Sequence, residues 1–168
     1  MIQEVYKVEL PQTKPLLIGD VMRCPLLKHY GASAYLPEKV LPLKNDSWVK
    51  PKEGGLWTSP VDSEWGWKDW NESEQFRDCD ERNSFTVKLN EDAKFFVIDS
   101  LEDLKNAPLI DGYSKKVMDF EYIAKKYDAI WLTEKGQNET HLNYQIDLYG
   151  WDCETVLIIN PNCCTAVA

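Results

Sequence analysis

The stretch that decides the fold runs from Tyr149 to Pro161 and reads YGWDCETVLIINP. Asp152 and Glu154 lead into the apolar, β-branched run at residues 155 to 159. A short run of this kind, stopped by Asn-Pro, is typical of a buried strand. Side chains alternate along an extended chain, so the two carboxylates are predicted on one face, about 7 Å apart, at the mouth of the last strand.

Other segments carry the periodicities of strands and helices. Apolar and polar side chains alternate from Ser84 to Leu89, as in a half-buried strand. The same reasoning predicts strands at residues 4–10, 54–60, 95–98 and 129–132, and helices at residues 63–76, after Ser100 and after Asp119. Residues 14–43 are predicted as short helices and loops, residues 108–114 as a loop, and residues 134–145 as a mobile polar loop.

These strands outnumber the helices and do not alternate regularly with them, which argues against a doubly wound sheet. We therefore predict an α+β fold of mixed, mainly antiparallel split β-sheets with short helices at one side. The 168 residues show no internal repeat or linker, so a single domain over residues 1–168 is expected.

The chain is acidic, with a formal net charge of -9. This charge disfavours general binding to a nucleic-acid backbone. No secretory signal or membrane-spanning run is visible, so a soluble, cytoplasmic protein is expected. The five cysteines, without a C-x-x-C pair, are then expected as reduced thiols and no metal site is predicted.

Signatures of P-loop, Rossmann, serine-hydrolase and zincin sites are absent from the sequence. The remaining candidates for chemistry are Asp152 and Glu154. One of two such acids can stabilise a developing positive charge while the other orients a nucleophile. The alternative is that both only keep a sheet edge soluble.

At this point the chain resembles the ADP-ribosyltransferase superfamily. That family combines a first-strand Arg or His, a second-strand Ser-Thr-Ser or Tyr, and a late Glu, and Asp152-x-Glu154 is similar to the E-x-E pair of its arginine-modifying members. Small phage and bacterial members carry segments comparable to those found here in the same order, over about two thirds of the chain: residues 55–60 (GLWTSP), 65–70 (WGWKDW), 127–130 (YDAI) and 149–152 (YGWD).

The resemblance implies NAD as co-substrate and no metal. Glu154 would be the catalytic acid that binds the ribose and stabilises its cation, and Asp152 would orient the acceptor. The cofactor-binding residues implied are Thr58, Ser59, Trp57, Tyr6, Lys7 and Trp67, with Trp70 as a further aromatic candidate and Arg23 as the alternative to Lys7 for the first-strand cation. The polar stretch at 134–145 would recognise the acceptor.

The acceptor implied is a protein or a nucleic acid, and no membrane is implied. The resemblance also suggests a toxin-like role in conflict between a phage and its bacterial host. An NAD hydrolase or an RNA 2′-phosphotransferase would use the same fold. A non-catalytic acidic binding protein, such as an inhibitor, remains the alternative from another class, and the cysteine spacing makes a metal or thiol protein the weakest hypothesis.

Overall fold

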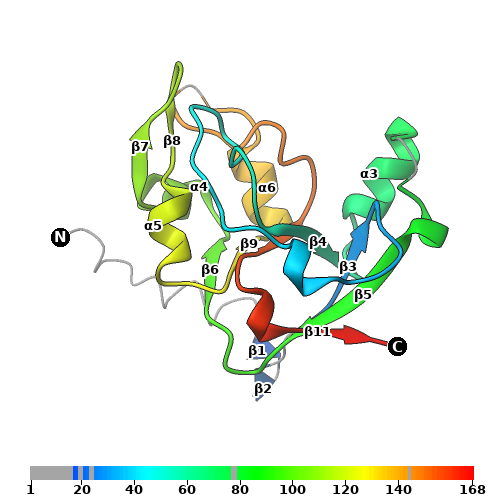
Figure 1. Cartoon of the computed structure of the whole chain (residues 1–168). Coiled ribbons are helices and arrows are strands. Elements are labelled where there is room, and N and C mark those ends of the chain that lie inside the picture. The colour runs from blue at the N-terminus through cyan, green and yellow to red at the C-terminus, as the bar shows by residue number, and fades with distance from the viewer. Residues whose placement is uncertain (1–16, 19–20, 23–24, 77–78, 144) are drawn as a thin grey trace.

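The computed structural model describes residues 17–18, 21–22, 25–76, 79–143 and 145–168 (Figure 1). Three residues with predicted roles, Tyr6, Lys7 and Arg23, lie outside the described residues, as does the strand predicted at 4–10.

A seven-stranded sheet forms the centre of the fold, in the order β11-β5-β3-β4-β10-β9-β6. Every neighbouring pair is antiparallel except β6 and β9, which are parallel. Its strands, in chain order, are β3 (Leu26–Tyr30), β4 (Leu56–Pro60), β5 (Ser84–Leu89), β6 (Phe95–Ile98), β9 (Ala129–Leu132), β10 (Thr155–Ile158) and β11 (Cys164–Val167).

Shorter elements surround this sheet. The helices are α3 (Trp67–Glu74), α4 (Leu101–Lys105), α5 (Phe120–Ala124) and α6 (Glu134–Thr140), with 3-10 turns η1 (Pro37–Lys39), η2 (Glu81–Asn83) and η3 (Pro161–Cys163). Two small hairpins pair β1 (Leu17–Ile18) with β2 (Val21–Met22), and β7 (Leu109–Asp111) with β8 (Lys116–Met118). Helices α4, α5 and α6 gather on one side of the sheet, and α3 stands apart from them beside β3 (Figure 1).

The two faces of the sheet have separate cores because side chains alternate along each strand. The helix-covered face buries Ile130, Leu157 and their neighbours against Leu104 of α4 and Phe120 of α5. We call the other side the second face; its core is Leu27, Leu56, Val87, Leu89, Phe95, Val97, Ala129, Trp131, Val156, Ile158 and Cys164. The face on which a side chain lies therefore determines on which side of the sheet it can contact a ligand.

The fold is α+β with a mostly antiparallel sheet, as predicted. The strands predicted at 54–60, 84–89, 95–98 and 129–132 are confirmed as β4, β5, β6 and β9, and the run at 155–159 as β10. Ser100 and Asp119 cap α4 and α5 through hydrogen bonds from the backbone N–H groups of Asp103 and Tyr122.

Three predictions about segments are wrong because each segment contains or precedes a strand that was not predicted. Residues 14–43 contain the five-residue strand β3, residues 108–114 contain β7, and β11 follows β10 in the chain. Strands β3 and β11 form by pairing with strands far along the chain, which overrides the local pattern, whereas β7 pairs with the neighbouring β8 in a hairpin. The helix predicted at 63–76 is confirmed as α3, with the narrower bounds Trp67–Glu74.

The predicted mobile loop at 134–145 is instead helix α6 over its first half. The Thr133 hydroxyl caps the helix by accepting from the Gly136 N–H at 3.0 Å, and the buried Thr140 hydroxyl donates to the Gly136 carbonyl. A Cβ on Gly136 would lie 2.1 Å from the Ile98 carbonyl oxygen, so glycine allows the helix to press against the end of β6. Small buried residues, rather than an apolar stripe, hold this helix, and periodicity therefore does not predict it.

Candidate functional site

Glu154 lies directly before β10, and its carboxylate is held by two donors. Oε1 accepts from the Ser63 hydroxyl at 2.7 Å, and Oε2 accepts from the Trp131 indole Nε1 at 2.9 Å. Burial raises the pKa of this carboxyl, while the hydrogen bonds from Ser63 and Trp131 act in the opposite direction. Because Trp131 belongs to the second face, the Glu154 carboxylate lies on that side of the sheet.

Ser59 and Thr58, on β4, fix the backbone around Glu154. The Ser59 hydroxyl donates to the Glu154 carbonyl oxygen at 2.8 Å and accepts from the Trp67 N–H at 2.8 Å. The buried Thr58 hydroxyl donates to the Val156 carbonyl at 2.6 Å. Both hydroxyls thus serve internal bonds, so they support Glu154, and their predicted contact with NAD stays a prediction.

The start of α3 approaches Ser59 closely. A Cβ on Gly66 would lie 2.9 Å from the Ser59 Cβ, so a larger residue there would push the helix away. The Glu154 N–H donates to the Trp65 carbonyl at 3.1 Å, and the Trp65 indole donates to the Asp152 carbonyl at 3.0 Å. The turn between β4 and α3 therefore holds the segment that carries both acids.

Asp152 does not lie on a strand with Glu154. A bend at Cys153 separates the two acids and β10 begins only at Thr155, so the prediction of an extended pair at the strand mouth is wrong. The bend removes the period of two on which that prediction depended. Among the described residues the Asp152 carbonyl oxygen accepts from Trp65, and the role of the Asp152 carboxylate in orienting an acceptor remains a prediction.

Three of the predicted aromatic residues, Trp57, Trp67 and Trp70, lie together on the helix-covered face. The Trp57 ring packs against Trp151 at a centroid distance of 4.8 Å and against Trp67 at 6.2 Å, and Trp67 contacts Trp70 at 5.4 Å. The Trp67 Nε1 is buried without a hydrogen-bond partner among the described residues. Trp57 and the Glu154 carboxylate therefore lie on opposite sides of the sheet, so the sheet separates Trp57 from the side on which Glu154 would meet a ligand.

The structure adds one residue that the sequence reasoning missed, His29 on β3. Its Nδ1 lies 2.8 Å from the Trp57 carbonyl oxygen, and its ring stacks on Phe85 at 4.9 Å. A carbonyl oxygen only accepts, so Nδ1 carries the proton and Nε2 of the neutral ring is an acceptor. Burial lowers the pKa of His29 and favours this neutral form.

His29, Thr58 and Glu154 come from three adjacent strands or their ends, on the second face. In the sheet register His29 pairs with Phe85, Lys28 pairs with Ser59, and Thr58 pairs with Val156, which places His29 beside Thr58. Glu154 precedes Val156 by two residues. Strand spacing then puts the Cα atoms of His29 and Glu154 about 12 Å apart. The signal in the sequence was LLKHY before Gly31, a short apolar-to-aromatic run that the nearby prolines obscured.

A pocket of about 280 Å³ lies beside Ser59 and Ser63. Its strand residues, Lys28 and Ser59, alternate with His29 and Thr58, so the pocket lies on the opposite side of the sheet from these two residues. Its opposite wall holds Glu81, which accepts from the Lys28 ammonium at 2.5 Å and from the Tyr30 hydroxyl at 3.0 Å. Burial and the Glu81 carboxylate raise the pKa of Tyr30, so this hydroxyl stays protonated. The pocket thus offers a neutral phenol and a paired lysine next to the serine that positions Glu154.

Within the described ranges, no three His, Cys, Asp or Glu side chains are grouped so that they could hold a metal ion, and no helix has the length and apolar character that crossing a bilayer requires. Among the described residues, Cys153, Cys163 and Cys164 are free cysteines. Comparisons of the chain with protein-family models, with curated proteins and with solved structures gave no match.

Proposed function

We propose that this protein is an ADP-ribosyltransferase that cleaves the nicotinamide-ribose bond of NAD and transfers ADP-ribose to a protein or nucleic-acid acceptor. The observation that carries the proposal is the placement of His29, Thr58 and Glu154 on one face of three neighbouring strand positions. The first-strand position that the resemblance requires is then filled by His29, in place of Lys7 or Arg23.

The chemistry suits a partly buried carboxylate. Departure of nicotinamide leaves positive charge on the ribose, and a fixed anion stabilises this charge more strongly in a dry site than in water. Ser63 and Trp131 hold Glu154 by both oxygens, so little reorganisation is needed when the charge develops. The Nε2 of neutral His29 would accept a hydroxyl of the substrate and orient the sugar.

The proposal is tested by incubating the protein with NAD and measuring free nicotinamide. Glu154→Gln keeps the size of the side chain and removes its charge, and we expect a loss of about 100-fold or more in the rate of release. Glu91→Gln, at an exposed turn before β6, is the matched control and should retain the parental rate. Equal rates for the parent and Glu154→Gln would refute the assignment of the acid.

The products separate the reactions that one fold can support. Radiolabelled ADP-ribose on a protein or nucleic acid identifies the transferase, and free ADP-ribose without labelled macromolecule identifies a hydrolase. Release of nicotinamide only with 2′-phosphorylated RNA would identify the phosphotransferase.

A second candidate, a non-catalytic binding protein, is favoured by an exposed aromatic cluster. Trp48, Tyr113 and Tyr149 are 57%, 75% and 61% exposed and line a second pocket of about 280 Å³. Exposed aromatic side chains around a small pocket are typical of protein interfaces. Absence of nicotinamide release with every acceptor source tested would favour this candidate.

A further inference from the structure

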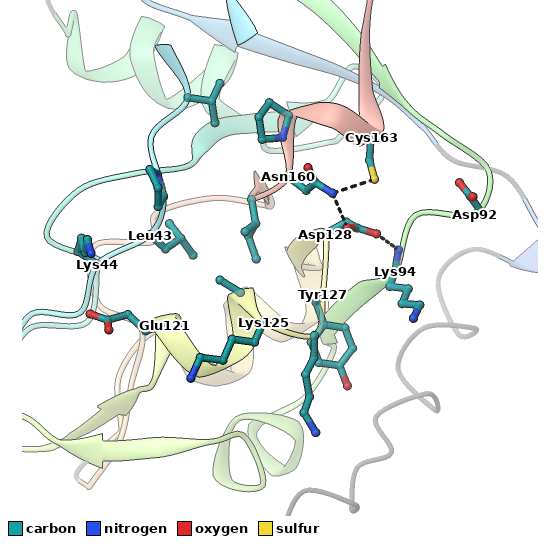
Figure 2. Close-up of a pocket in the computed structure, with 16 residues that line it drawn as sticks. Leu43, Lys44, Asp92, Lys94, Glu121, Lys125, Tyr127, Asp128, Asn160 and Cys163 are labelled. Carbon is teal, nitrogen blue, oxygen red and sulfur yellow. Dashed lines mark hydrogen bonds between the residues drawn. The ribbon is translucent and has the colours of Figure 1, made fainter. Parts of the chain in front are cut away.

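A separate pocket lies at the far end of β10 from Glu154. It has a volume of about 870 Å³, is open to solvent, and is bordered by three segments of chain, at 40–44, 121–128 and 159–163, with Asp92 and Lys94 at one side (Figure 2). Glu154 and Asn160 stand six residues apart across β10, which corresponds to about 20 Å of extended chain. This pocket is therefore separate from the proposed NAD site.

The wall of the pocket is apolar and its rim is cationic. Val40, Pro42, Leu43, Ala124, Ile159 and Pro161 supply the apolar side chains. Four exposed lysines line the pocket: Lys44, Lys94, Lys125 and Lys126. In a chain with a net charge of -9, a pocket with four ammonium groups is an exception to the surrounding field.

Three acids also line the pocket, so the four lysines leave an excess of one positive charge, and two of these acids accept hydrogen bonds from other groups. Asp128 accepts from the Lys94 backbone N–H at 2.8 Å and from the Asn160 side-chain amide at 3.0 Å, as Figure 2 shows. Glu121 accepts from the Asn45 N–H at 3.0 Å. Asp92 is the third acid that lines the pocket. Over the described part of the chain, none of the four lysines forms an ion pair.

The side chains that line the pocket indicate the chemical class of its ligand. Lysine presents a point charge that suits phosphate, whereas recognition of a planar carboxylate more often uses the fork of arginine. Several lysines around one pocket favour an anion with more than one charge. The volume lies in the range of small-molecule sites, and the apolar wall leaves room for an organic group beside the phosphates. Inorganic phosphate alone would fill only a small part of the pocket.

We propose that this pocket binds a small phosphorylated organic molecule, with its phosphates at Lys94, Lys125 and Lys126 and its organic part against the wall formed by Leu43 and Ile159. The site does not depend on the proposed transferase activity. It would let the protein bind a nucleotide or sugar phosphate at a position remote from Glu154.

The experiment uses ADP as the probe, titrated into the full chain at low salt and followed by calorimetry and by amide chemical shifts. We expect saturable binding that weakens with added salt, because the rim lysines are exposed and their attraction is screened. The amides of Lys94 and Asn160 should shift. Adenosine should not compete, and pyrophosphate should bind about tenfold more weakly because it cannot bury apolar surface against the wall.

Matched triple variants test the position. Replacing Lys94, Lys125 and Lys126 by Gln should weaken ADP binding about tenfold or more, from the loss of three charge contacts. Replacing Lys52, Lys88 and Lys105 by Gln removes the same charge from exposed positions that do not line the pocket, and should change the affinity less than about twofold. If both triple variants weaken ADP binding equally, the proposal is wrong, because the binding would then depend on the overall charge of the protein and not on this pocket.

Glu154→Gln separates this site from the proposed NAD site. The variant should bind ADP with unchanged affinity. Loss of ADP binding in Glu154→Gln, or no saturable binding of ADP at millimolar concentration, would overturn the proposal. A protein that binds ADP here but never releases nicotinamide would refute the transferase and leave this pocket standing.

Discussion

The two ends of β10 hold charge in opposite ways. At the end where the strand begins, one partly buried carboxylate, Glu154, accepts hydrogen bonds on both oxygens, from Ser63 and Trp131. At the other end several ammonium groups, among them Lys94 and Lys125, stand exposed around an open pocket without ion-pair partners among the described residues. Strand β10 thus has a fixed, partly buried carboxylate at one end and several exposed ammonium groups at the other.

This difference teaches what each end can be expected to do. A desolvated and pre-positioned charge acts strongly on one atom, and its removal should change a rate. Solvated charges act weakly and together, and their removal should change an affinity that depends on salt. Mutations at the two ends should therefore differ in kind as well as in size.

After the loss expected for Glu154→Gln, the largest effect is expected at His29. His29→Ala should reduce nicotinamide release about 100-fold, because it removes the acceptor that orients the sugar. His141→Ala, at the C-terminal end of α6, removes the chain's other histidine and should leave the rate within about twofold of the parent. A parental rate in His29→Ala, measured by release of nicotinamide, would return the first-strand role to Lys7 or Arg23.

The next effect is on folding stability at Ser59. Ser59→Ala should lower the free energy of unfolding by about 1–3 kcal/mol, since the Trp67 N–H and the Glu154 carbonyl both lose their partner in a buried place. Urea denaturation gives the value. Ser114→Ala, at an exposed position, is the control and should change the free energy by less than about 0.5 kcal/mol. A similar small change at Ser59 would mean that water replaces its bonds.

A smaller effect is the pH dependence of stability conferred by Glu154. Burial raises the pKa of this group in the folded state, so the folded protein binds its proton more tightly than the unfolded chain does. Below the pKa of Glu154 in the unfolded chain, about 4.3, this group does not reduce the stability. Stability is lost as the pH rises through the higher pKa of Glu154 in the folded protein. Glu154→Gln should therefore be more stable than the parent at neutral pH, and the difference should vanish in acid, as thermal melts at several pH values would show. A variant less stable than the parent at every pH would mean that the carboxylate is needed for packing.

The smallest effect is expected from the pocket lysines on stability. The triple Gln variant of Lys94, Lys125 and Lys126 should unfold within about 0.5 kcal/mol of the parent, because exposed charges without partners contribute little. A larger loss of unfolding free energy in urea denaturation would show that these lysines stabilise the fold. The expected difference between the two ends of β10 would then be wrong.

Much of the sheet follows from sequence patterns, but the site does not. Alternation located β5, and apolar runs located β6, β9 and β10, since these strands carry their own periodicity. Strand β3 was not predicted from the sequence, because its pairing with β4 and β5 depends on residues far along the chain. Alternation along a strand predicts which residues share a face, but not which face meets a ligand, and so Trp57 was grouped with Glu154 although the sheet lies between them.

The supports of Glu154 were beyond prediction for the same reason. Ser63 and Trp131 reach its two oxygens only because the turn after β4 and strand β9 flank β10 in space. Neither residue forms a motif with Glu154 in the sequence. The bend at Cys153, which separates Asp152 from Glu154, is likewise set by the tertiary bonds of Trp65 to this segment.

The hydrogen bond from Ser59 to Glu154 has a consequence for how the chain acquires its fold. It joins residues 95 positions apart, and β4 meets β10 over a similar separation. Closing so long a loop costs entropy before any contact repays it, whereas β6, α4, α5 and β9 form one contiguous stretch that can condense early. The Glu154 carboxylate should thus acquire its hydrogen-bond partners late in folding. A newly synthesised chain would then have no formed site until β4 has paired with β10.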